Sequence, residues 1–153
     1  MKNPDCPLCQ SINEHALWRD DFCRVIWVDE PDYPGFCRII LNHHVREMTD
    51  LAPQDRRRLM DVVFAVEAVV RTVLRPDKIN LASLGNMVPH LHWHVIPRFA
   101  DDRHFPDAIW APPRRDALRL SIERPQYEGS IRRSFICTSP DQCLANAVTQ
   151  VAR

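Results

Sequence analysis

One segment of the chain alternates histidine with large apolar residues, and this alternation limits how the chain can fold. It reads His90-Leu91-His92-Trp93-His94-Val95-Ile96-Pro97. Successive side chains of a β-strand point to opposite faces, so the histidines share one face, while the core side takes Leu91, Trp93 and Val95. Solubility alone would favour Lys, Glu or Thr on the polar face. The segment therefore predicts a strand with a functional imidazole face.

Two chemistries are compatible with three imidazoles spaced roughly 7 Å apart along a strand. The three side chains can hold a catalytic zinc ion and leave one coordination position open. Alternatively, the middle histidine is a nucleophile, and its neighbours set its tautomer and charge. The spacing alone does not decide between these two possibilities.

The composition indicates one globular domain, because 45% of the 153 residues are hydrophobic and 26% are charged. The 20 basic and 20 acidic residues cancel, which removes the electrostatic argument for nucleic-acid binding. No apolar run approaches the roughly 20 residues that cross a membrane, and the first residues lack the apolar region of a secretory signal. We therefore expect a cytoplasmic protein with no nucleic-acid or membrane partner.

Cys6 and Cys9 form a C-x-x-C pair near the N-terminus. In a reducing cytoplasm such a pair indicates metal or redox chemistry rather than a disulfide. Structural zinc usually has four nitrogen or sulfur ligands, so the pair would need two more. The alternative is a pair of unpaired thiols on a mobile segment.

The hydrophobic pattern predicts an α+β fold with an antiparallel sheet. Strands are expected at 25–28, 36–41, 78–82 and 90–97, and valines at three- and four-residue steps predict one long helix over 53–75. Beyond residue 105 three prolines in a short stretch indicate irregular structure. Ser139 followed by Pro140 predicts the start of a short C-terminal helix.

The histidine segment and its two flanks resemble the histidine triad (HIT) family of nucleotide hydrolases and transferases. The segment Leu84–Pro89 leads into the triad as a Gly-Gln-x-Val segment does in that family, and Ile39–Val45 is similar to its strand that ends in His-Val. The resemblance covers roughly residues 6–105. It implies a HIT-like fold with a sheet of about five strands, so we expect a HIT domain at 1–105 and a C-terminal extension at 106–153 packed on it.

The resemblance implies that His92 attacks the α-phosphorus of a nucleotide and forms a covalent nucleotidyl-histidine, which water then hydrolyses. His94 and His90 complete the catalytic triad, with His94 contacting the α-phosphate. The implied nucleotide contacts are Asp29 toward the ribose, Asn80 and Asn86 toward the phosphates, and Arg98 toward distal phosphates. Asn80 is also explained as an ordinary strand-end residue, Asp29 as a turn residue and Arg98 as a solvated cation.

One position departs from the family pattern. Met87 stands where one branch of the family carries a hydroxyl residue that touches the phosphate, and a methionine side chain cannot take that role. Because of this departure, the preferred leaving group stays undetermined. The assignment of His92 as the nucleophile is not affected.

The resemblance also implies a structural zinc site made by Cys6, Cys9, His44 and His90. Such a Cys2His2 site has no open position, so it would stabilise the fold and leave His90 unable to join a three-histidine catalytic zinc. No catalytic cofactor is then needed. His43 is the nearest competitor for the role of His44. The remaining histidines, His15 and His104, are expected on the surface, with His104 within reach of the pocket mouth.

The implied activity is hydrolysis of nucleotide conjugates, namely dinucleoside polyphosphates and nucleoside phosphoramidates, by a cytoplasmic homodimer whose sheet continues across the two-fold axis. Two alternatives stay open. One is nucleotidyl transfer of the galactose-1-phosphate uridylyltransferase type, for whose duplicated architecture this chain is short. The other is a nucleotide-sensing protein without turnover.

Overall fold

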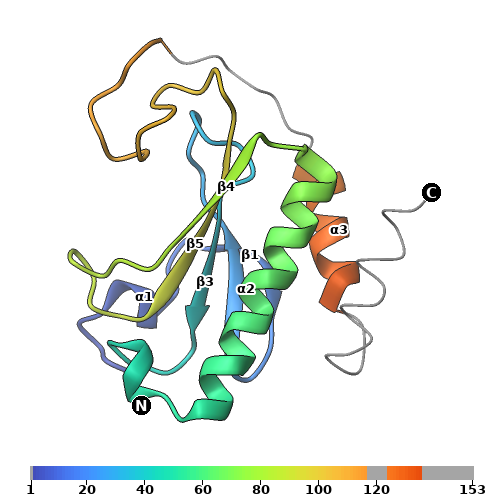
Figure 1. Ribbon diagram of the computed structural model, residues 1–153. Helices are drawn as coiled ribbons and strands as arrows, with labels where there is room; N and C mark the ends of the chain where they lie inside the picture. Colours follow the sequence, from blue (N-terminus) through green and yellow to red (C-terminus); the bar gives the residue numbers. More distant parts are fainter. Residues whose placement is uncertain (1, 117–123, 136–153) are drawn as a thin grey trace.

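A computed structural model of the chain describes residues 2–116 and 124–135, so the helix predicted from Ser139 lies outside the described residues. Five strands form one antiparallel sheet in the order β1-β2-β3-β5-β4 (Figure 1). The strands are β1 (His15–Arg19), β2 (Cys23–Trp27), β3 (Cys37–Leu41), β4 (Lys78–Ala82) and β5 (His92–Arg98). The helical elements are α1 (Pro7–Gln10), the 3-10 helix η1 (Met48–Asp50), α2 (Pro53–Leu74) and α3 (Arg124–Phe135). The predicted α+β class is confirmed.

The long helix α2 covers one face of the sheet (Figure 1). It begins at Pro53, whose fixed φ suits the first turn, and it ends at Arg75, which adopts a left-handed conformation with φ 48°. Its valine stripe packs on the sheet through Leu59, Val62, Val63, Val66, Val69 and Val70. Valine has a modest helix propensity, so burial of this stripe is what stabilises the helix.

Besides the short helices α1 and η1, the structure contains a strand, β1, and a helix, α3, that the hydrophobic pattern does not predict. Strand β1 pairs with β2 at the edge of the sheet through a register irregularity between Ala16 and Trp18. Helix α3 lies beside α2 and contacts β1, and its Ile131 is fully buried in the main core (Figure 1). In the described part of the chain, no helix is both long and apolar enough to cross a membrane.

The opposite face of the sheet carries a smaller apolar cluster and the histidines. Tyr33, Phe36 and Ile96 form this cluster, and Val28 and Ile109 pack against it. The loop that follows β5 therefore folds back over one end of the same face. The core thus lies between α2 and the sheet, which leaves the other face available for a site.

Candidate active site and metal centre

Strand β5 presents His92 and His94 on the face that points away from α2. The centroids of the two rings lie 4.8 Å apart. Both residues are buried, with 7% of His92 and 4% of His94 exposed to solvent. Leu91 and Val95 belong to the main core, and Trp93 packs against it. His90 precedes the strand, which begins at His92, because the His90 backbone N–H donates to Val88 in a tight turn. The apolar residues Leu91, Trp93 and Val95 thus lie at the core as the alternating pattern predicts, even though the strand is shorter than predicted.

The ring of His92 has a defined tautomer. Its Nδ1 lies 2.6 Å from the carbonyl oxygen of His90, and because a carbonyl can only accept, Nδ1 carries the proton and donates. Burial lowers the pKa of His92, with a smaller contribution from the positive charge of Arg38, and the hydrogen bond to His90 only partly opposes this. At neutral pH the ring is therefore neutral, and its Nε2 carries a free lone pair.

His94 is more strongly desolvated. Burial lowers its pKa to about 3, with smaller contributions from His92 and Arg38. Its Nδ1 is buried and has no hydrogen-bond partner within the part of the chain that the structure describes. Its ring contacts Phe36 and the half-exposed indole of Trp110, with both centroid distances at 5.5 Å. His94 thus has a buried, unpartnered polar atom on a ring that lies next to the ring of His92.

The four residues expected to hold zinc lie together at the start of this strand. The Nδ1 atom of His90 lies 3.4 Å from Sγ of both Cys6 and Cys9, and Nδ1 of His44 lies 3.4 Å from Sγ of Cys9. All four donor atoms lie within 4.8 Å of one another. His43, the competing histidine, is exposed and outside this cluster.

The cluster has the dimensions of a tetrahedral zinc site. Bonds of about 2.3 Å to sulfur and 2.0–2.1 Å to nitrogen place tetrahedral S and N ligands about 3.5 Å apart, close to the observed 3.4 Å. His90 Nε2 lies 2.9 Å from the carbonyl oxygen of Leu41, so it donates there and leaves Nδ1 free to bind a metal. Burial lowers the pKa of His90 to about 4, which keeps this ring neutral. The donor set fits zinc.

The residues expected to contact the nucleotide have different environments. Asn86 and Asp29 are exposed, and Met87 is 94% exposed beside Asn86. Asn80 is half-buried on β4, and its side-chain oxygen accepts a hydrogen bond of 2.6 Å from Arg98. The exposed side chain of Asn86 is accessible to a ligand, and the Asn80 oxygen has a protein partner in Arg98.

Arg98 is 1% exposed and is held by groups of the protein itself. It donates to both carboxylate oxygens of Asp102, at 2.7 and 3.0 Å, and to the carbonyl oxygen of Asp107 at 2.8 Å. Asp102 also accepts from the backbone of residues 99, 104 and 105. These contacts make Arg98 the anchor of the loop after β5, and they leave its assignment to distal phosphates as a prediction only.

The expectation of a surface position for His104 is wrong. The residue is 8% exposed, and its Nδ1 forms a hydrogen bond with the hydroxyl of Tyr33. The Asp102 turn draws the backbone of His104 inward, so its ring stacks on Tyr33. His15, in contrast, is exposed as expected and lies 3.4 Å from Glu128 of α3.

Sequence reasoning missed two side chains next to the triad. Arg38 lies on β3 directly opposite His94, and Trp110 reaches the same ring from the loop after β5. The signal for Arg38 was a charged residue inside the apolar strand segment Phe36–Leu41, two positions from Ile40, which pairs with His92. No local pattern marks Trp110, because its contact depends on the path of an irregular loop.

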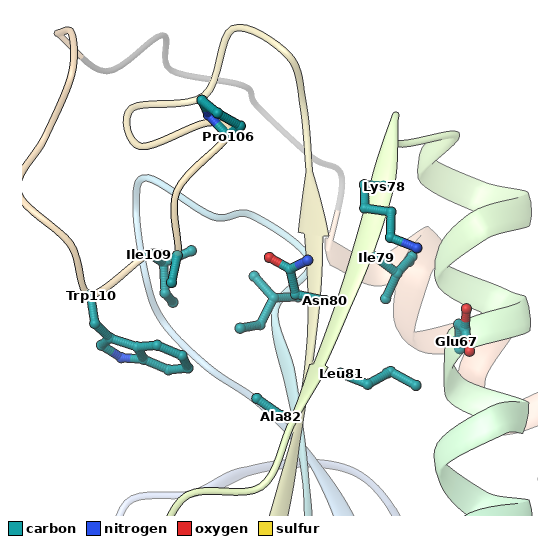
Figure 2. A pocket seen from close by; sticks show the side chains of 11 residues that line it. Glu67, Lys78, Ile79, Asn80, Leu81, Ala82, Pro106, Ile109 and Trp110 are labelled. Carbon is teal, nitrogen blue, oxygen red and sulfur yellow. The ribbon is translucent and has the colours of Figure 1, made fainter.

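An open groove runs along the outer edge of β4, at one side of this site. Figure 2 shows Ile109 and Trp110 on one side of the strand and Glu67 of α2 on the other. Ala82 lines this groove and is the register partner of His94. The groove therefore extends from the edge of the sheet to the neighbourhood of the triad.

The fold and the site define a histidine triad protein: an antiparallel sheet with a long helix on one face and alternating histidines on the other. The HIT domain profile matches residues 10–101, and the chain belongs to the HIT family.

Individual relatives cover different shares of the chain. Adenylylsulfatase HINT3 of Arabidopsis thaliana is 28% identical over 151 residues, which cover 92% of this chain and 74% of that protein. AP-4-A phosphorylase of Mycobacterium tuberculosis is 30% identical over 81 residues, which cover 49% of this chain and 42% of that protein. The chain thus spans less than half of the phosphorylase.

Solved structures share the fold. A histidine triad protein from Bradyrhizobium japonicum superimposes with a TM-score of 0.68 at 24% identity, covering 81% of this chain and 92% of that one. A zinc-bound histidine triad family protein from Mycobacterium smegmatis gives a TM-score of 0.57 at 20% identity, covering 84% and 91% of the two chains. The expected HIT fold is confirmed.

Proposed function

We propose that this protein is a hydrolase that cleaves nucleotide conjugates at the α-phosphate through a covalent intermediate on His92. The observation that carries the proposal is the tautomer of His92: its Nδ1 donates to the His90 carbonyl, so its Nε2 is a neutral nucleophile on the face of the sheet opposite α2. The names of the relatives, an adenylylsulfatase and an AP-4-A phosphorylase, support a substrate with a nucleotidyl group.

The reaction consists of two displacements at phosphorus. First, the lone pair of His92 Nε2 attacks the α-phosphorus, a P–N bond forms, and the bond to the leaving group breaks with its electron pair. A phosphate leaving group departs as an anion, and an amine leaving group takes one proton from solvent as it departs. Then water attacks the same phosphorus, the P–N bond breaks, and one water proton is released as the mononucleotide forms and His92 becomes neutral again. The adjacent His94 contacts the phosphate oxygens, and the side-chain amide of Asn86 forms a hydrogen bond with the leaving group.

The Cys2His2 cluster holds a structural zinc ion in this proposal. When bound, zinc cross-links the N-terminal segment to the start of β5 and adds binding free energy to folding. Because Cys6, Cys9, His44 and His90 occupy all four positions, the ion takes no part in the reaction. The ring of His90 is therefore structural, whereas its carbonyl positions the nucleophile.

The functional unit is a homodimer that continues the sheet through β4. This strand is the last of the sheet order, so its outer edge has unpaired backbone groups in the described part of the protein. On α2, the 48% exposed Phe64 lies one helical turn from Glu67, which lines the groove beside β4. Pairing of two β4 strands would cover this apolar edge.

The decisive experiment compares wild type with His92→Ala on adenosine phosphoramidate, adenosine 5′-phosphosulfate, diadenosine tetraphosphate and a nucleotide sugar offered with galactose 1-phosphate. We expect wild type to hydrolyse at least one of these and His92→Ala to lose at least a thousandfold in kcat/KM while keeping its fold and nucleotide affinity. The matched control is His43→Ala, which removes an exposed histidine and should leave kcat/KM unchanged.

Two other outcomes contradict the proposal. Formation of a new nucleotide sugar in the presence of galactose 1-phosphate would identify a nucleotidyltransferase. Nucleotide binding without turnover by wild type, equal to that of His92→Ala, would identify a nucleotide-sensing protein.

A further inference from the structure

Three buried or half-buried arginines lie on the strand face that carries the triad, and two of them form ion pairs with carboxylates. Arg24 on β2 donates to both oxygens of Glu14, at 2.6 and 2.7 Å. Arg98 on β5 donates to both oxygens of Asp102 in the same bidentate manner. Both arginines are nearly inaccessible, with 3% and 1% exposed, so the fold supplies a counter-charge wherever it buries a guanidinium here.

The third arginine, Arg38, is different. It lies in the middle of the sheet on β3, with Ile26 of β2 and His94 of β5 as its register partners. Its Nε is buried without a hydrogen-bond partner, and no carboxylate among residues 2–116 and 128–133 forms an ion pair with it. Its guanidinium contacts the Phe36 ring at 5.7 Å from the centroid. A partly buried cation therefore faces the site without an ion pair in the described chain, because Glu14, whose charge acts on Arg38 from a distance, is already paired with Arg24.

We propose that Arg38 is an oxyanion-binding residue of this site and that its missing counter-ion is a phosphate or sulfate group of the substrate. This inference rests on the proposed function, and it names the substrate charge that the site recognises. Two unused polar atoms on neighbouring strands support it: Arg38 Nε and His94 Nδ1 are both buried and unpartnered. The oxygen atoms of an anion bound over these residues would supply hydrogen-bond partners for both nitrogen atoms.

The chemistry of a guanidinium favours this ligand over an uncharged one. Its planar donor groups match the oxygens of phosphate and sulfate, and a partly desolvated cation binds an anion more strongly than a neutral acceptor. The oxyanion is either the nucleotidyl phosphate itself or an anionic leaving group attached to it.

The test uses Arg38→Met, which keeps length and apolar bulk without charge, and Arg38→Lys, which keeps charge without the planar donors. Binding of AMP and of adenosine is measured by calorimetry, and kcat/KM is measured for diadenosine tetraphosphate and adenosine phosphoramidate. The control is Arg57→Met, because Arg57 is an exposed arginine on α2. Thermal unfolding of each variant without ligand reports on structural effects.

If Arg38 binds the nucleotidyl phosphate, Arg38→Met weakens AMP binding about ten- to a hundredfold and leaves adenosine binding within twofold. If it binds the leaving group, AMP binding is retained, and kcat/KM falls by the same factor for diadenosine tetraphosphate but not for the phosphoramidate. Arg38→Lys gives a smaller loss in either case. Either result supports the inference, and the difference between them shows whether Arg38 binds the nucleotidyl phosphate or the leaving group.

Three results overturn the inference: equal weakening of AMP and adenosine, no change in any ligand measurement, or a Tm loss in Arg38→Met as large as that of Arg24→Met. The last would show that Arg38 is a structural cation like its paired neighbour. If wild type turns over no substrate but AMP binding still depends on Arg38, the proposed hydrolase function fails and the oxyanion site stands.

Discussion

The Nδ1 atom of His92 lies 2.6 Å from the carbonyl oxygen of His90, whose own ring lies 3.4 Å from both Cys6 and Cys9. One residue thus belongs to the metal cluster through its side chain and to the candidate active site through its backbone. Because the His90 carbonyl selects the His92 tautomer, displacement of His90 would disturb the nucleophile without touching it. Disruption of the Cys2His2 cluster is therefore expected to reduce catalysis at His92 as well.

Removal of the metal is expected to lower both the Tm and kcat. A metal ion present at a free concentration of about 100 times its Kd adds about 2.7 kcal/mol to the free energy of unfolding. For a chain of this size, loss of that amount corresponds to a Tm decrease of roughly 5–10 °C. Differential scanning fluorimetry and hydrolysis assays before and after chelation measure the two effects. Cys9→Ser should reproduce both.

Re-addition of zinc should restore both quantities, and magnesium, which prefers oxygen ligands, should restore neither. Full turnover by folded, metal-free protein would contradict the coupling through His90.

The buried pair of Arg98 and Asp102 is expected to dominate the stability of the loop after β5. Burial disfavours the charged form of Asp102, but donation from Arg98 and from the backbone N–H groups of His104 and Phe105 outweighs this, so its pKa is lowered. Breaking a buried pair costs about 3–5 kcal/mol, so Asp102→Asn should decrease the free energy of unfolding by about that amount at pH 7. Asp101→Asn, at the exposed neighbour, is the control.

This loss depends on pH in a definite direction. A carboxyl with a lowered folded pKa stabilises fully above its unfolded pKa of about 3.9, and the stabilisation disappears as the pH falls through the folded pKa. The difference between wild type and Asp102→Asn should therefore be constant from pH 7 to 5 and shrink below about pH 4. Urea unfolding followed by circular dichroism measures it, and a difference that grows in acid would refute the assignment.

Trp110 is expected to report on ligand binding. Its indole is 53% exposed, contacts the ring of His94 edge-on and lines the groove beside β4 (Figure 2). A nucleotide at His94 would change the environment of this side chain, so AMP should alter the tryptophan emission of wild type and alter that of Trp110→Phe far less. Because the side chain is half-exposed, the same substitution should change the free energy of unfolding by less than about 1 kcal/mol. An undiminished emission change in the variant would place the nucleotide elsewhere.

Phe64→Glu tests the proposed dimer. The side chain is 48% exposed on α2, so a charge is tolerated in a monomer but is unfavourable in a buried interface. Light scattering at micromolar concentration should show a dimer for wild type and a lower mass for the variant, with unchanged circular dichroism. Asp61→Asn, an exposed position on the same helix, should keep the wild-type mass. A monomeric wild type would refute the homodimer.

The elements that could be predicted before the fold was known are those with a hydrophobic period visible along the chain. Alternation predicted that the three histidines share one face, and valine spacing predicted α2, because both patterns follow directly from backbone geometry. The family resemblance implied that Cys6, Cys9, His44 and His90 form one site, and the structure brings these four side chains together in a cluster that could hold a metal ion.

The pairing of polar groups, in contrast, could not be predicted and became visible in the folded structure. Arg24, Arg38 and Arg98 look alike in the sequence, yet two form ion pairs with carboxylates and Arg38 forms none in the described part of the chain. His104 is drawn inward by a turn around Asp102, and Trp110 reaches His94 through an irregular loop. Burial and ion pairing depend on residues brought together from distant parts of the chain, and a local pattern contains no record of those partners.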